Sequence, residues 1–286
     1  MMSTSISTNE LSNIKLSMLR PKWGKYVQAL FILALALLIF GPLLNLLIWS
    51  VAETWYYPHK LPLTWGFKYW EQVFGSDSDV YSSLLTSLAI AILTVLVCLL
   101  VSIPAAYALA RRSLPFRAAV MLIFLLPQAF PNIAVYMNVA RIFYYWDLNG
   151  TILGVVLVHT VHGLMFSIWI TVAAFSSVDP QQELAARNIG AGPIKVFFSV
   201  SLPQAMPGII ASCIFVFLES LDEFTGTFFV GAPEITTLPL LLYTASMEGN
   251  YQIASITAMV LLVPSISFML LVDRFIKPEM LSKIGH

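Results

Sequence analysis

Six long stretches of this chain contain no Asp, Glu, Lys or Arg, and this pattern constrains its fold more than any other feature. They cover residues 26–52, 80–110, 118–140, 148–178, 196–218 and 249–272. A transmembrane helix needs about 20 predominantly apolar residues to cross the hydrocarbon core of a bilayer. Charged residues make up only 10% of the sequence, whereas soluble proteins contain about 25%. We therefore expect an all-α membrane protein with six transmembrane helices.

Prolines predict where two of these helices begin or break. Pro207 suits a first helical turn, so the fifth helix is expected to start near it and to run beyond the charge-free stretch. Pro127 and Pro131 are expected to break the third helix where it lines a cavity, because backbone groups freed in lipid need other partners or water. Gln128 and Asn132 beside this break are candidates to contact a solute, although hydrogen bonds between helices are the more frequent use of such side chains.

The distribution of Lys and Arg predicts the orientation in the membrane. Of these 15 residues, 12 lie in the N-terminal tail, the second and fourth loops and the C-terminal tail, and the other three lie in the remaining loops. Because cytoplasmic segments are enriched in Lys and Arg, both termini of this multi-pass protein are expected in the cytoplasm. The expected parts are a polar tail (1–25), a transmembrane domain (26–275) and a second tail (276–286).

Several functional classes are disfavoured by the composition. Lys plus Arg and Asp plus Glu both number 15, so the chain has no basic field for a nucleic-acid partner. Cys98 and Cys213 lie in apolar runs and are expected to pack as small hydrophobic residues. His159 and His162 share a helix face, but we find no further metal ligand and expect them to hydrogen-bond between helices. No clustered nucleophile and base indicates a catalytic residue.

Residues 178–206 form the most distinctive loop. Asp179 and Pro180 are typical of a helix start, and Gly190 and Gly192 of a helix end. A second short helix is expected after the glycines, ended by Leu202-Pro203. Two short helices on the cytoplasmic face would suit docking into a groove of another protein.

This loop also resembles a known motif. Ala185, Ala186, Gly190, Val200, Leu202 and Pro203 follow the spacing of the "EAA" loop in the permease subunits of bacterial binding-protein-dependent ABC importers. The chain departs from that pattern at its first position, where Leu184 replaces Glu and Glu183 lies one residue earlier. On a helix this offset rotates the carboxylate by about 100°, so the usual acidic contact with the ATPase is made differently or lost.

The resemblance implies a type I ABC importer permease fold and a set of partners. The loop would be the coupling helix, with Glu183, Leu184, Ala185, Ala186, Gly190, Leu202 and Pro203 in contact with a cytoplasmic ATPase. The chain would pair with a second permease, a homologous partner being expected and a homodimer the alternative. Two ATP-binding subunits and an extracytoplasmic solute-binding protein would complete the importer. The chain has no phosphate-binding G-x-x-x-x-G-K-[ST] loop, so ATP and Mg would bind the partner ATPase and no cofactor this chain.

Three acids, Glu219, Asp222 and Glu223, have the i, i+3, i+4 spacing of one helix face near the end of the fifth span. A charge at the bilayer centre costs about 3 kcal/mol on insertion scales and usually marks a functional site. Acids this close repel one another unless a cation or a basic partner neutralises them. Three interpretations remain open: a solute path, pairing with an Arg of a partner subunit, or a solvated helix end.

The segments around these acids resemble one branch of the permease family. Ser220-Leu221-Asp222-Glu223, followed by Thr237-Leu238-Pro239-Leu240, is similar to the spermidine/putrescine branch, which implies a polyamine as the solute. Residues 104–111 are equally similar to sugar-importer permeases. Iron(III), thiamine and phosphonate importers have related permeases and remain alternatives. A membrane-embedded enzyme and an ion-coupled carrier are more distant alternatives.

Overall fold

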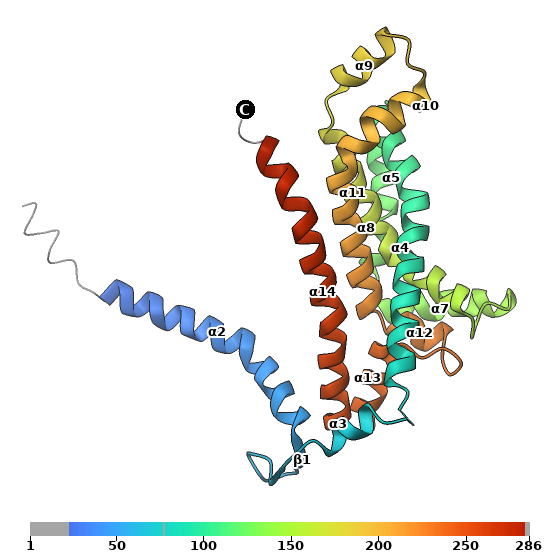
Figure 1. Cartoon of the computed structure of the whole chain (residues 1–286). Helices are drawn as coiled ribbons and strands as arrows, with labels where there is room; N and C mark the ends of the chain where they lie inside the picture. Colours follow the sequence, from blue (N-terminus) through green and yellow to red (C-terminus); the bar gives the residue numbers. More distant parts are fainter. Residues whose placement is uncertain (1–22, 77, 284–286) are drawn as a thin grey trace, which may run out of the picture. The chain divides into compact units, whose positions relative to one another are not determined.

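The computed structural model describes residues 23–76 and 78–283, so almost all of the predicted N-terminal tail lies outside the described residues. The described residues are mostly helical (Figure 1). The elements are α2 (Trp23–Ser50), β1 (Ala52–Thr54), β2 (Thr64–Trp65), α3 (Lys68–Val73), α4 (Val80–Arg111), α5 (Arg117–Ile123), α6 (Leu126–Ala129), α7 (Asn132–Tyr145), α8 (Ile152–Ser177), α9 (Pro180–Asn188), α10 (Pro193–Val196), the π-helix η1 (Phe197–Ser201), α11 (Leu202–Asp222), α12 (Thr225–Val230), α13 (Leu238–Met247) and α14 (Tyr251–Lys283).

Contacts divide the chain into two units, Met1–Ile48 and Trp49–His286. The described part of the first unit is a single apolar helix, the larger part of α2, whose leucine and isoleucine side chains are largely exposed. Apolar side chains around a whole helix are typical of a segment surrounded by lipid. The second unit contains all the other elements.

Five helices among the described residues are long and apolar enough to cross a membrane: Gly24–Ser50, Val80–Arg111, Ile152–Ser177, Pro193–Asp222 and Tyr251–Leu270. The predicted class of all-α membrane protein is therefore confirmed. The count of six helices and the cytoplasmic position of both termini remain predictions, because the segment predicted as the third span has a different form.

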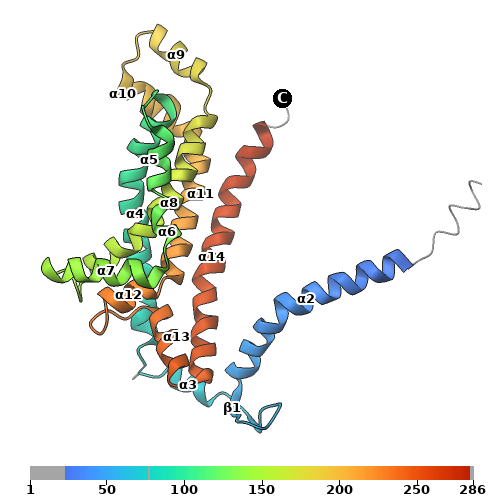
Figure 2. The ribbon, with the colours of Figure 1, turned by 180° about the vertical axis from the view of Figure 1, so that it is seen from behind.

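Residues 118–140 do not form one continuous helix. They are divided among α5, α6 and α7, and in both views α7 runs across the direction of α4 and α8 (Figures 1 and 2). Pro127 and Pro131 lie in the interruption, as predicted. Pro131 directly precedes α7 with ψ 130°, an extended conformation that cannot continue a helix. The break directs the start of α7 toward the end of α11.

The fifth predicted helix starts earlier than expected. Pro207 lies inside α11, which begins at Leu202 and follows α10 and η1 without a loop. Our expectation that Leu202-Pro203 ends the second short helix was therefore wrong. Proline lacks the N–H that the helical ladder needs, and the wider π-helical turn, which ends at Ser201, two residues before Pro203, accommodates this loss while the chain stays helical.

Helices α4, α8 and α11 pack along one another and form the main core of the second unit (Figure 1). A chain of buried hydroxyls links all three helices: Ser167 Oγ donates to Ser102 Oγ at 2.6 Å, and Ser212 Oγ donates to Ser167 Oγ at 3.2 Å. Small residues and hydroxyl hydrogen bonds are typical of helix contacts in membranes, where hydrophobic burial between helices gives little driving force.

Gly208 of α11 allows a close approach to α8. A Cβ atom added there would overlap the Cβ of Ala174 on α8. We expect Gly208→Val to destabilise the protein by about 1–3 kcal/mol, because the two helices must separate to admit the side chain. The thermal denaturation midpoint of purified protein in detergent would report this loss. Gly41→Val is the matched control, because Gly41 also lies in an apolar helix but has no atom within 4 Å of the added Cβ. Equal midpoints for the two variants would contradict the packing argument.

The end of the second unit opposite α9 carries a short hairpin and α3 (Figure 1). Strands β1 and β2 are antiparallel, with Ala52 opposite Trp65 and Thr54 opposite Thr64. Trp70 of α3 donates its indole N–H to the carbonyl of Ser50 at 2.7 Å. This bond satisfies the polar edge of a half-buried aromatic ring and joins α3 to the residue at the end of α2.

Candidate functional site

The loop 178–206 projects from one end of the bundle as α9, a turn and α10 (Figure 1). The predicted helix start is confirmed: Asp179 is the N-cap residue, its carboxylate accepts a hydrogen bond from the N–H of Gln181 at 2.9 Å, and Pro180 begins the helix. Gly190 has a φ of +89°, so it ends α9 in the left-handed region that favours glycine. Gly192 instead directly precedes α10 with an ordinary φ of −67°.

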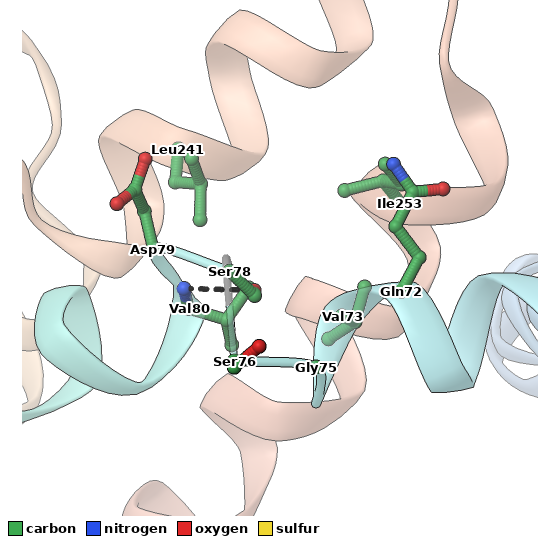
Figure 3. A pocket seen from close by; sticks show the side chains of 9 residues that line it. All are labelled: Gln72, Val73, Gly75, Ser76, Ser78, Asp79, Val80, Leu241 and Ile253. Atoms are coloured by element: carbon green, nitrogen blue, oxygen red, sulfur yellow. Dashed lines mark hydrogen bonds between the residues drawn. The ribbon is translucent and has the colours of Figure 1, made fainter.

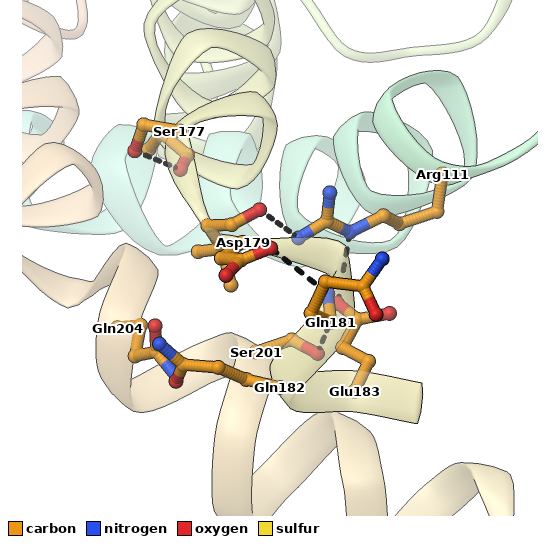
Figure 4. A network of polar contacts seen from close by, with 10 residues as sticks. Arg111, Ser177, Asp179, Gln181, Gln182, Glu183, Ser201 and Gln204 are labelled. Atoms are coloured by element: carbon orange, nitrogen blue, oxygen red, sulfur yellow. Dashed lines mark hydrogen bonds and ion pairs between the residues drawn. The ribbon is translucent and has the colours of Figure 1, made fainter. Parts of the chain in front are cut away.

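The predicted coupling residues of α9 have different environments. Glu183 is buried, and its carboxylate is directed into the protein toward Arg111 and Ser201 (Figure 4). Leu184 is 48% exposed, and Ala185 is exposed while Ala186 is half-buried. The acid of α9 is therefore turned inward, and its neighbour Leu184 faces outward.

Two further exposed hydrophobic residues accompany Leu184. Ile189 is 87% exposed at the end of α9, and Ile194 is 74% exposed in α10. We refer to Leu184, Ile189 and Ile194 as the docking surface. Exposed hydrophobic residues on a loop between otherwise polar side chains are typical of a contact site for another protein. Sequence analysis missed the two isoleucines, because only the structure shows that they are not buried against the bundle.

A second group of predicted residues meets at the opposite end of α11. A cavity of about 190 Å³ is lined by Asn132, Glu219, Asp222, Glu223, Phe224 and Thr225. All three acids therefore share one cavity, although α11 ends at Asp222 and Glu223 lies just beyond it with an extended ψ of 114°. Gln128 is exposed and does not line this cavity. The break before α7 places Asn132, but not Gln128, beside the acids.

Glu223 is held by a network that crosses several elements. Its carboxylate accepts a hydrogen bond from the hydroxyl of Tyr136 on α7 at 2.9 Å and another from the N–H of Gly226 at 2.9 Å. The Tyr136 hydroxyl also lies 2.6 Å from Nδ1 of His162 on α8. Tyr136, His162 and Glu223 are all buried. These bonds compensate for the burial of Glu223 and fix the direction of its carboxylate.

His159 links α8 to the chain on both sides of the acids. Its Nδ1 lies 2.8 Å from Ser220 Oγ, and its Nε2 lies 2.9 Å from Thr227 Oγ1. The structure therefore confirms the prediction that both histidines hydrogen-bond between helices. Tyr136 was missed by the sequence analysis, because its partners lie 26 and 87 residues away and no local pattern connects them.

The cavity has an uncompensated negative character. None of the three acids forms an ion pair with any residue that the structure describes. Asp222 is exposed and Glu219 is half-buried, so their carboxylates remain accessible from the cavity. Carboxylates, a side-chain amide and a hydroxyl are groups that bind amines or other hydrogen-bond donors, and a cation would relieve the repulsion between the acids.

A larger cavity of about 490 Å³ lies at the same end of the unit as α3 (Figure 3). It is lined by Gln72, Val73, Gly75, Ser76, Ser78, Asp79, Val80, Leu241 and Ile253. In Figure 3, Ser78 Oγ accepts a hydrogen bond from the N–H of Val80 and Asp79 is directed toward Leu241. None of the predicted site residues lines this cavity, so we do not assign the solute site to it.

Known proteins resemble the chain over most of its length. Residues 101–280 match the family described as binding-protein-dependent transport system inner membrane component. A putative ABC transporter permease protein, ORF1 of Streptomyces antibioticus, is 32% identical over 211 residues, which cover 72% of this chain and 92% of the relative. The putrescine transport system permease protein PotI of Escherichia coli (strain K12) is 26% identical over 234 residues, 78% of this chain and 81% of the relative.

The fold also matches a solved structure. A chain of a bacterial ABC transporter involved in the import of the acidic polysaccharide alginate superposes with a TM-score of 0.67 at 17% sequence identity. The match covers 96% of this chain and 99% of that one. The predicted fold of an ABC importer permease is therefore confirmed.

Proposed function

The chain belongs to the family of inner membrane components of binding-protein-dependent transport systems, and on that premise we propose that it transports a polyamine and is driven through the loop 178–206. It is a permease subunit of an ABC importer, a multi-pass protein of the inner membrane and not itself an enzyme, since ATP is hydrolysed by a separate subunit. The observation that supports the solute class best is the cavity that holds three acids, none of which has an ion-pair partner among the residues that the structure describes.

The loop 178–206 is the proposed contact with the ATPase. Two cytoplasmic ATP-binding subunits would come together on binding ATP and Mg, and their movement would reach the bundle through α9. The docking surface is apolar, so the matching groove of the ATPase would be lined by apolar side chains at that point. A second permease subunit, as a heterodimer, and an extracytoplasmic solute-binding protein would complete the importer.

The acid-lined cavity is the proposed part of the solute path. Asp222 and Glu219 would bind ammonium groups of putrescine or spermidine, and Asn132 would accept a hydrogen bond from the same solute. Glu223, held by Tyr136 and the N–H of Gly226, would add a carboxylate of fixed direction. The sequence similarity to the putrescine permease PotI supports a polyamine as the solute. Alternating access would open this cavity first to the binding protein and then to the cytoplasm.

Gly190 provides a test of the coupling role. Valine at this position must adopt a φ of +89°, which costs about 1–3 kcal/mol. The turn between α9 and α10 is therefore expected to adopt a different backbone conformation in this variant. We expect Gly190→Val to lower solute uptake per ATP hydrolysed by about tenfold, measured in proteoliposomes with the complete importer and its binding protein. Gly192→Val is the matched control, because both glycines have open space around an added Cβ but Gly192 has an ordinary φ. Unchanged uptake per ATP in Gly190→Val would count against the loop as the coupling element.

A further inference from the structure

One ion pair joins the loop 178–206, which we call the docking loop, to the transmembrane bundle. Arg111 is the last residue of α4, and its Nε donates to Oε1 of Glu183 on α9 at 2.8 Å (Figure 4). The same carboxylate oxygen accepts a hydrogen bond from Ser201 Oγ of η1 at 2.7 Å. A terminal nitrogen of the Arg111 guanidinium donates to the carbonyl of Val178, directly after α8, at 2.7 Å. Two side chains thus connect α4, the end of α8, α9 and η1.

The pair is well shielded from solvent. The side chain of Arg111 is 12% exposed and that of Glu183 is 8% exposed. It is also the only ion pair between residues that the structure describes. Exposed ion pairs usually contribute little, whereas removal of one partner from a buried pair leaves a charge without compensation. The connection is therefore a strong constraint on where α9 can lie.

The segments on the two sides of this pair have different proposed roles. Leu184, the neighbour of Glu183, faces outward on the docking surface, whereas η1 continues directly into α11, which ends at the acid-lined cavity. Tyr107 of α4 packs edge-on against Phe197 of η1 with ring centroids 4.9 Å apart, so α4 and η1 also touch beside the pair. A displacement of α9 that keeps the ion pair intact must therefore move α4 and η1 with it.

We propose that Arg111 is a positioning residue whose pairing with Glu183 transmits the displacement of the docking loop to α4 and α11. This inference rests on the proposed function of the loop. In this proposal Glu183, next to the position of the family's glutamate, binds Arg111 within the same chain. The ATPase contacts the apolar docking surface instead. A planar guanidinium suits this role, because it can bond a carboxylate and a backbone carbonyl at the same time.

The test compares two neighbouring arginines. Arg111→Gln is expected to lower uptake per ATP hydrolysed at least about tenfold in proteoliposomes of the complete importer, because Glu183 remains buried without its charged partner. Arg112→Gln changes an exposed arginine without an ion pair among the described residues and should retain the wild-type ratio. Equal ratios for the two variants would overturn the proposal.

A charge exchange separates transmission from simple folding. The double variant Arg111→Glu/Glu183→Arg restores opposite charges, so its uptake per ATP should exceed that of either single exchange by about tenfold. If the double variant is no better than the single variants, the pair is not the connection. If the exchanged proteins do not reach the membrane, Ser201→Ala decides: it removes one hydrogen bond to the charged carboxylate of Glu183 without changing any charge, and should lower uptake per ATP about tenfold. An unchanged ratio in Ser201→Ala would then overturn the proposal.

Failure of the proposed function and failure of the ion-pair role give different experimental results. If the wild-type importer shows no ATP-dependent uptake, or no ATPase co-purifies with it, the proposed function fails. If the wild-type importer is active and Arg111→Gln retains its uptake per ATP, only the role of the ion pair fails.

Discussion

Exchanging Asp222 for Asn and Glu223 for Gln together is expected to lower the uptake of putrescine and spermidine by about a hundredfold or more. Each charge-assisted hydrogen bond contributes about 1.5–3 kcal/mol, so the loss of two corresponds to at least this factor. The amide oxygen of Gln can accept the hydrogen bond from the N–H of Gly226, and its NH2 group can donate to the Tyr136 hydroxyl, so the local fold should be retained. Radiolabelled uptake in proteoliposomes with the binding protein measures the effect.

The control for this variant changes two acids outside the cavity. Asp147→Asn/Glu248→Gln removes the same number of charges from exposed positions, and uptake should remain close to that of the wild type. A maltodextrin is offered in parallel. If the importer takes up the maltodextrin, and takes it up equally well with Asp222→Asn/Glu223→Gln, the polyamine is excluded as the solute. The acids would then serve subunit assembly or form a solvated helix end.

Leu184→Asp is expected to release the ATPase from the complex, with an affinity lower by about a hundredfold. Burying a leucine in an interface contributes about 1.5–3 kcal/mol, and a carboxylate left without a partner in an apolar groove adds a further cost. The amount of ATPase that co-purifies with the permease, and its binding constant in detergent, would show the loss. Glu183 should stay paired with Arg111 in this variant, because its side chain is directed away from Leu184.

Leu114→Asp is the matched control for the docking surface. Leu114 is 38% exposed, compared with 48% for Leu184, and lies in the segment that follows α4. Retention of the ATPase by Leu184→Asp would show that α9 is not the contact. Leu184→Glu, which restores the acid of the family pattern, gives a second criterion: tighter binding than wild type would indicate a basic rather than an apolar groove.

The local features of the docking loop were predictable because they depend on neighbouring residues. Asp179 caps the helix that Pro180 begins, and Gly190 adopts the positive φ that a helix end requires. The extent of the second helix was not predictable in this way. Its continuation through η1 into α11 depends on a π-helical turn shortly before Pro203, and residues of that turn contact distant parts of the chain, Ser201 with Glu183 and Phe197 with Tyr107.

In the acid-lined cavity, too, some features follow from neighbouring residues and others depend on residues far apart in the sequence. The spacing of Glu219, Asp222 and Glu223 predicted that they would lie together, and the structure places them in one cavity. Their surroundings could not be read from the sequence, because Tyr136 reaches Glu223 only after the interruption at Pro131 directs α7 toward the end of α11.

The sequence by itself determined the class of the protein, five of its long apolar helices, the caps of α9 and the grouping of the acids. Each of these follows from hydropathy or from spacing within a few turns of helix. Only the tertiary structure decided that Glu183 faces Arg111 while Leu184 faces outward, because that choice depends on a partner 72 residues away. A buried charge must find its counter-charge wherever the packing of the helices places it, and no local pattern specifies that position.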